Sequence, residues 1–80
     1  MKRRRASPAV RLKPEPLWEQ ITRRNMSQND LARRAEISSG YLSQLIGGKK
    51  SPSPDVRRRL QAALEISRFD ELFVMEYRDE

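Results

Sequence analysis

The sequence predicts an all-α domain, because helical signals recur along its 80 residues and no segment has a clear strand pattern. Apolar residues in segment 56–64 repeat at i, i+4, i+7 and i+8, which places them on one helical face. Serines stand where helix N-caps are expected, and Gly47-Gly48 stands where a helix should end. We expect five short helices that share one core, since none is long enough to be stable alone in water.

The first two helices are expected on either side of residues 25–26. Pro16 suits a first helical turn, because its ring fixes φ and the missing N–H is not needed there. The cations of Arg23-Arg24 are favourable near the C-terminal end of that helix. Ser27, with Asp30 three residues later, resembles a capping box and predicts the start of the second helix.

The third and fourth helices have clear starts. Ser38 follows a tight turn over residues 36–38, and its hydroxyl can accept a bond from a backbone N–H two or three residues later. Gly47-Gly48 ends this helix, because glycine adopts the left-handed conformation at little cost. After a basic loop, Ser53-Pro54-Asp55 combines an N-cap, a first-turn proline and a first-turn acid.

The C-terminal end is less determined by pattern. Ser67 can cap a short fifth helix, while residues 73–77 could fray, continue as helix or form a short strand. Proteins that bind single-stranded nucleic acid stack its bases on aromatic side chains that are exposed on a basic surface. Three of the four candidate residues, Phe69, Leu72 and Phe73, lie instead in the acidic end of the chain. We therefore expect all four in the core or in an interface: Trp18, Phe69, Leu72 and Phe73.

Charge divides the single domain unevenly. The net charge is +6, yet residues 1–59 hold 15 basic and 5 acidic side chains, whereas residues 60–80 hold 2 basic and 6 acidic ones. A basic body suits a polyanionic partner with the acidic end turned away from it, although solubility alone also explains such a charge. We divide the chain into a flexible basic N-terminal arm (1–13), a helical domain (14–73) and an acidic C-terminal tail (74–80).

Composition argues against several other classes of protein. Without cysteine or histidine there are no disulfides, thiolate zinc sites or cysteine nucleophiles, and we predict no metal, cofactor, small-molecule ligand or enzymatic activity. The segment 47–51 resembles a phosphate-binding loop only superficially, since no strand precedes it. No apolar run approaches the ~18 residues of a membrane span, and none follows the basic start, so a cytoplasmic protein is expected.

Residues 28–47 have the layout of a helix-turn-helix, in which two helices of about eight residues flank a three-residue turn. Small Ala32 allows the two helices to approach closely. The side chains on the outer face of the second helix are short, polar and uncharged, which suits a helix that lies in a groove. The apolar seam between the helices is expected to consist of Leu31, Ala35, Ile37, Leu42 and Leu45.

These residues resemble a known family. The run 27–35, then Ile37-Ser38, then the run 41–49 is similar to the helix-turn-helix of the phage Cro and lambda-repressor family, also called the xenobiotic-response-element (XRE) family. The resemblance covers about residues 16–73 and implies a compact five-helix lambda-repressor-like domain. The family usually has glycine where Glu36 stands, so Glu36 is expected in a left-handed conformation at a cost of about 1 kcal/mol.

The resemblance implies that the second helix of the motif enters the major groove of double-stranded DNA. Base-reading positions of the family fall on Ser39, Gly40, Ser43 and Gln44. Gln44 is the best specificity candidate, because glutamine can bind adenine N6 and N7 together and discriminate by ~1–3 kcal/mol. Gly40 either admits the DNA closely, leaves room for a thymine methyl group, or is a tolerated defect costing about 0.5–1 kcal/mol.

Contacts to the DNA backbone are expected around the reading helix. In the family, a glutamine at the position of Gln28 bonds a phosphate and often buttresses the recognition helix; an ordinary first-turn polar residue is the alternative. Tyr41 either reaches a phosphate, which we favour, or packs over the edge of the motif. The expected backbone contacts are Ser27, Gln28, Tyr41, Lys49, Lys50 and Ser51.

The basic arm has two interpretations. It either wraps the duplex or enters its minor groove, or it is a solubilising tail. The residues concerned are Lys2, Arg3, Arg4 and Arg5.

The preferred function is a transcriptional regulator, a repressor, which binds a palindromic operator as a homodimer with recognition helices ~34 Å apart. The apolar end, residues 69–77, is the surface expected to carry self-association. The alternative is an antitoxin-like or accessory protein-interaction module, whose acidic C-terminal end binds a partner protein.

Overall fold

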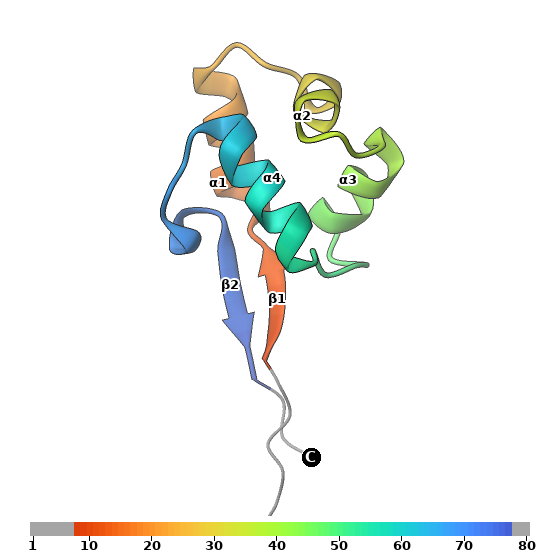
Figure 1. The fold of residues 1–80 in the computed structure, drawn as a ribbon, viewed down its shortest axis with the longest axis vertical. Coiled ribbons are helices and arrows are strands. Elements are labelled where there is room, and N and C mark those ends of the chain that lie inside the picture. The colour runs from red at the N-terminus through yellow and green to blue at the C-terminus, as the bar shows by residue number, and fades with distance from the viewer. Residues whose placement is uncertain (1–7, 78–80) are drawn as a thin grey trace, which may run out of the picture.

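The computed structural model describes residues 8–77 and has a mostly helical body from which a two-stranded ribbon extends (Figure 1). The prediction of five helices is wrong within these residues, because the fifth is a single 3-10 turn and both ends of the described chain are strands. None of the helices in this range has the length and apolar character needed to cross a membrane. The elements in chain order are β1 (Ala9–Leu12), α1 (Pro14–Arg23), α2 (Gln28–Ala35), α3 (Ser39–Ile46), α4 (Pro54–Leu64), the 3-10 turn η1 (Phe69–Glu71) and β2 (Phe73–Glu76).

The helix starts follow the predicted caps closely. The Ser27 hydroxyl accepts from the backbone N–H of Asp30, and the Asp30 carboxylate accepts from the N–H of Ser27, each at 3.0 Å. Ser38 and Ser53 cap α3 and α4 in the same way, accepting from the N–H three residues later at 3.0 and 3.2 Å. The expected cap at Ser67 is wrong. The turn η1 begins at Phe69, and the residue at its N-cap position is Arg68, which makes no side-chain capping bond.

Three helices are followed within two residues by a residue other than glycine in the left-handed conformation. These are Asn25, Glu36 and Glu65, with φ of 54°, 61° and 56°, and the expectation for Glu36 is confirmed. In each case the following N–H bonds the carbonyl five residues earlier at 2.9 Å, which satisfies helix-end carbonyls as in a Schellman motif. The residue after each turn is apolar and packs on or in the core: Met26, Ile37 and Ile66.

The core draws on every helix and on both strands. Leu72 and Phe73 are buried and Phe69 is partly buried beside Phe73, with ring centroids 5.3 Å apart, so these three are core residues as expected. Trp18 is not a core residue, because 45% of it is exposed on the surface of α1. The buried apolar residues are Leu12, Leu17, Ile21, Leu31, Ala32, Ala35, Leu42, Leu45, Leu60, Leu64, Ile66, Leu72 and Phe73.

The ribbon joins the two ends of the described chain. Strands β1 and β2 pair antiparallel with Leu12 opposite Phe73 and Ala9 opposite Glu76, and the N–H of Lys13 extends the pairing to the Leu72 carbonyl at 2.8 Å. Residues 9–12 are therefore a strand, although the sequence placed them in a flexible arm. Of the alternatives left open for residues 73–77, the strand is correct over 73–76. Local periodicity could not show this pairing, because the partners come from opposite ends of the sequence.

Candidate nucleic-acid interface

The predicted helix-turn-helix is present as α2, a turn over residues 36–38, and α3. Ala32 of α2 is 2% exposed and belongs to the core that α2 and α3 share, which agrees with the small side chain expected there. The rest of the seam is buried or packs on the core, as predicted. It consists of Leu31, Ala35, Ile37, Leu42 and Leu45.

The turn between the two helices is held from outside the motif. Arg59 of α4 donates from Nη1 to the carbonyl oxygen of Glu36 at 3.1 Å, and its Nε lies 3.2 Å from a carboxylate oxygen of Asp55. Glu36 is the residue in the left-handed conformation, so α4 braces the motif at its most strained position.

The outward face of α3 is available to a partner. Ser39, Gly40, Ser43 and Gln44 are all exposed. A Cβ added to Gly40 would have no neighbour within 4 Å, so packing inside the protein does not require glycine there. Tyr41, one residue on, is partly buried and packs against the core.

The start of α2 contains a contact that the sequence did not reveal. The indole Nε1–H of Trp18, on α1, donates to Oε1 of Gln28 at 3.1 Å. The capping box holds the backbone on either side of Gln28. The hydrogen bond from the backbone N–H of Ser27 is the main cause that lowers the pKa of the Asp30 carboxyl to about 2, and the hydrogen bond from Arg33 adds to it. Both the backbone and the side chain of Gln28 are therefore positioned in the free protein.

The loop after α3 folds back onto the end of that helix. The N–H groups of Lys49 and Lys50 bond the main-chain carbonyl of Gln44 at 2.9 and 3.3 Å, and the side chains of residues 49–51 are exposed. Gly48 has φ of 78°, and a Cβ there would lie 2.5 Å from Nη2 of Arg11. Strand β1 thus brings a cation against this basic loop. Sequence reasoning missed Arg11 as an ordered neighbour of the loop, because it assigned the residue to a flexible arm.

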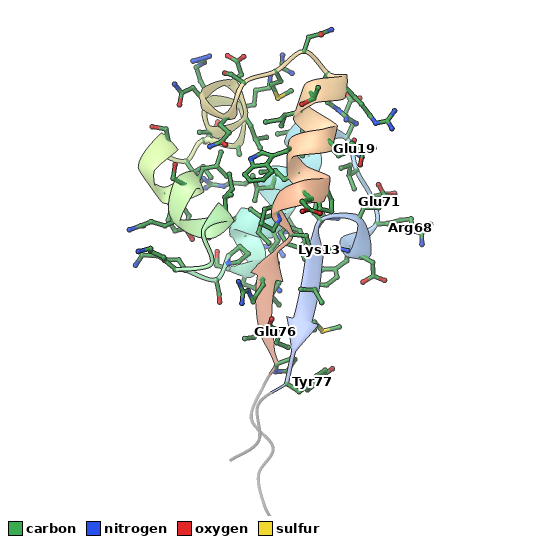
Figure 2. All side chains as sticks on the ribbon, turned by 180° about the vertical axis from the view of Figure 1, so that it is seen from behind. Lys13, Glu19, Arg68, Glu71, Glu76 and Tyr77 are labelled. Carbon is green, nitrogen blue, oxygen red and sulfur yellow. The ribbon has the colours of Figure 1, made fainter. Side chains whose placement is uncertain are left out.

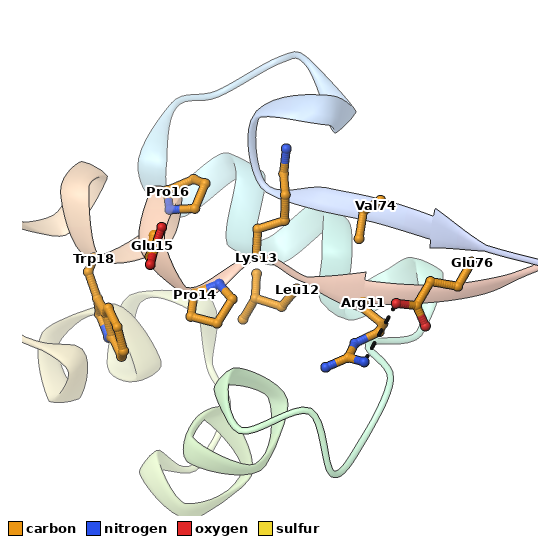
Figure 3. A pocket seen from close by; sticks show the side chains of 9 residues that line it. All are labelled: Arg11, Leu12, Lys13, Pro14, Glu15, Pro16, Trp18, Val74 and Glu76. Carbon is orange, nitrogen blue, oxygen red and sulfur yellow. Dashed lines mark ion pairs between the residues drawn. The ribbon is translucent and has the colours of Figure 1, made fainter.

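A shallow groove of about 610 Å³ runs between the start of α1 and the ribbon (Figure 3). Trp18 lies at one end, and Arg11 lies at the other, where its Nη1 is 3.5 Å from a carboxylate oxygen of Glu76. Pro14 and Pro16 line the stretch between them. The groove therefore extends from Trp18, which bonds Gln28, to Arg11, which lies against Gly48.

Acidic residues gather on another side of the molecule. Figure 2, the view from behind, shows Glu71 and Arg68 at η1, and both ribbon views place η1 and α3 on opposite sides. Asp70 and Glu71 form most of this turn and are exposed. The acidic groups of η1 thus lie away from the interface expected around α3, whereas Glu76 of β2 lies beside Arg11.

The expected contact residues occupy three segments of the chain. Four lie on the outer face of α3, Tyr41 of the same helix packs against the core, two lie at the start of α2, and the loop 49–51 follows α3. The expected arm contacts Lys2, Arg3, Arg4 and Arg5 fall outside the described residues.

Comparison with known proteins agrees with this architecture. A helix-turn-helix family model, HTH_3, matches residues 19–71. The crystal structure of the transcriptional regulator VanUg, form II, is similar in fold, with a TM-score of 0.68, 16% identity, and coverage of 96% of this chain and 100% of that chain. A search of curated proteins found no match. Since the family model spans well over half of the sequence, the chain belongs to the DNA-binding helix-turn-helix family of the XRE, or Cro/C1, type.

Proposed function

We propose that the protein is a transcriptional repressor that binds a specific double-stranded DNA site by docking α3 in the major groove. The observation that carries this proposal is the outer face of α3, which is exposed and uncharged while the opposite face is anchored in the core. B-DNA's major groove is wide enough to admit one helix, and short polar side chains can approach base edges there.

Base reading is assigned to Ser39, Gly40, Ser43 and Gln44, with Gln44 as the main determinant. Gln44 has an exposed side chain, while its main-chain carbonyl anchors the following loop. Its amide can therefore pair with an adenine edge without giving up a contact that holds the fold. Internal packing does not require glycine at position 40, and the role we assign to the missing side chain is close approach of the DNA.

Backbone binding is assigned to Tyr41 within α3 and to residues before and after this helix. Each neutralised phosphate should contribute about −0.9 to the slope of log affinity against log salt. Arg11 joins the expected set, because it lies against the loop that carries Lys49 and Lys50. The full set is Ser27, Gln28, Tyr41, Lys49, Lys50, Ser51 and Arg11, with Lys2, Arg3, Arg4 and Arg5 as additional contacts.

Selection of bound sequences from a pool of random duplex DNA tests this function directly. The wild-type protein should enrich one motif, and Gln44→Ala should weaken binding to that motif by roughly tenfold while sparing unrelated duplex. Lys49→Ala should weaken both and make the salt slope shallower by about 0.9. Gln61→Ala, which removes a glutamine from α4, is the matched control and should change neither. Failure to enrich any motif would contradict specific recognition.

The dimer is assigned to the exposed part of β2. The apolar surface expected over residues 69–77 becomes narrower, because Leu72 and Phe73 are used by the protein's own core. Val74, Met75 and Tyr77 remain, at 41%, 47% and 68% exposure. Two such subunits would present recognition helices ~34 Å apart to a palindromic operator.

Point substitutions test the dimer better than truncation, which would remove core residues. Val74 and Met75 are adjacent in β2 and so point to opposite faces of the ribbon. Val74→Lys or Met75→Lys should convert the dimer to a monomer in analytical ultracentrifugation, and the sensitive position identifies the face. An unchanged dimer in both variants would contradict this assignment.

The same exposed strand favours a second candidate function, an accessory module that binds a partner protein through its acidic C-terminal end. An open strand edge can pair with another chain. A sharp footprint on DNA by the protein alone favours the repressor. A footprint that requires a co-purified partner favours the module.

A further inference from the structure

Trp18 is a large aromatic residue that lies on the surface of the described chain. It is the single tryptophan of the sequence, it is 45% exposed, and it lies on α1 rather than on the helix-turn-helix. A large aromatic side chain left half in water gives up part of the free energy of burial. Trp18 instead makes a polar contact, because its indole Nε1–H donates a 3.1 Å hydrogen bond to Oε1 of Gln28.

The direction of this bond follows from chemistry. An indole N–H can only donate, so it selects the oxygen of the Gln28 amide and leaves the NH₂ end free. Within residues 8–77, the NH₂ group of Gln28 donates no hydrogen bond to another residue. A free amide can turn either end toward a ligand, and only the NH₂ end attracts an anion. The contact with Trp18 thus disfavours the orientation that would turn an oxygen toward a phosphate.

We propose that Trp18 is a positioning residue for DNA binding, which orients the Gln28 amide so that its NH₂ group meets a DNA phosphate. This inference rests on the proposed function. The capping box already orders the backbone around Gln28, and the indole orders the far end of its side chain. Ordering the side chain before binding reduces the entropy that DNA binding would otherwise cost.

A double-mutant cycle on the duplex enriched by the wild-type protein tests the proposal. Trp18→Phe keeps an aromatic side chain but removes the N–H donor, so affinity should fall about three- to tenfold, the range of one hydrogen bond. Gln28→Ala should cause at least the same loss. Because Trp18 acts through Gln28, the double variant should bind as weakly as Gln28→Ala alone.

Other outcomes of the cycle are informative. A further loss in the double variant would overturn the proposal, because Trp18 would then contact DNA independently. Wild-type affinity of Trp18→Phe, with Gln28→Ala still impaired, would overturn it while leaving the proposed function intact. If the wild-type protein enriches no duplex, the proposed function fails and this inference fails with it.

A second measurement separates positioning from a merely structural role. The indole N–H of the single tryptophan gives one resolved NMR signal, which should shift and exchange faster with water in Gln28→Ala. In the wild-type protein the signal should stay protected when DNA binds, because Trp18 keeps its partner. Gln61→Ala, the control, should leave the signal unchanged. A signal indifferent to Gln28→Ala would overturn the contact, and thermal unfolding of each variant excludes loss of fold as the cause.

Discussion

The helix-turn-helix and the ribbon of β1 and β2 are held together by different kinds of interaction. In the helix-turn-helix, each helix start has its own capping serine and each helix is short and amphipathic. In the ribbon, neither strand has a partner near it in sequence, and pairing requires both ends of the described chain to meet. The motif is thus specified locally, whereas the ribbon depends on contacts between segments that are distant in the sequence.

The two regions also differ in strain. The turn of the motif contains Glu36 in the left-handed region, a conformation that Arg59 and the Schellman hydrogen bonds support. Neither strand of the ribbon contains a residue with positive φ. The ribbon contributes mainly through burial, since Leu12 and Phe73 pair with each other and close one end of the core.

The largest expected effect tests whether the ribbon is part of the core. Phe73→Ala should destabilise the protein by about 3–5 kcal/mol, because it removes a fully buried aromatic side chain. Urea unfolding followed by circular dichroism measures the loss. Thr22→Ala, at an exposed position of α1 outside the proposed dimer surface, is the control, and it should cost less than about 0.5 kcal/mol. Similar losses in both variants would show that the ribbon is not packed as described.

A smaller effect tests the strain in the motif. Glu36→Gly should stabilise the protein by roughly 0.5–1 kcal/mol, because relief of the left-handed strain exceeds the entropy that glycine adds to the unfolded chain. Differential scanning calorimetry should show a rise of a few degrees in Tm. Glu65→Gly, at the same conformation outside the motif, should behave alike. A lower Tm for Glu36→Gly alone would mean that its side chain stabilises the turn.

The smallest effect tests the capping box. The pKa of Asp30 lies at about 2 instead of 3.8. The largest cause is the hydrogen bond from the backbone N–H of Ser27 to the carboxylate, and the next is the hydrogen bond from Arg33. A lowered pKa means that the capping contribution is present above the ordinary pKa and is lost as pH falls toward 2. Carboxyl chemical shifts measured by NMR should follow this midpoint.

Arg33→Ala serves as the control for that titration. It should raise the Asp30 midpoint only partway, since the backbone N–H of Ser27 remains. A wild-type midpoint at the ordinary value would show that the carboxylate does not accept these bonds in solution.

Much of the fold could be predicted because its determinants are local. The caps at Ser27, Ser38 and Ser53 act within three residues, and the apolar seam of the motif follows helical spacing. The left-handed turn at Glu36 could be expected by comparison with a family that uses glycine there. The predicted fifth helix failed because residues 69–71 make only one turn before the chain extends into β2.

The sequence by itself determined the helix-turn-helix, its family and the exposed residues of α3, because short-range hydrogen bonds and helical periodicity decide these features. Only the tertiary structure decided that residues 9–12 pair with residues 73–76, that Arg11 lies against Gly48, and that Trp18 bonds Gln28. Each of these is a meeting of segments distant in sequence. Such meetings depend on how the helices pack in space, which no local pattern records.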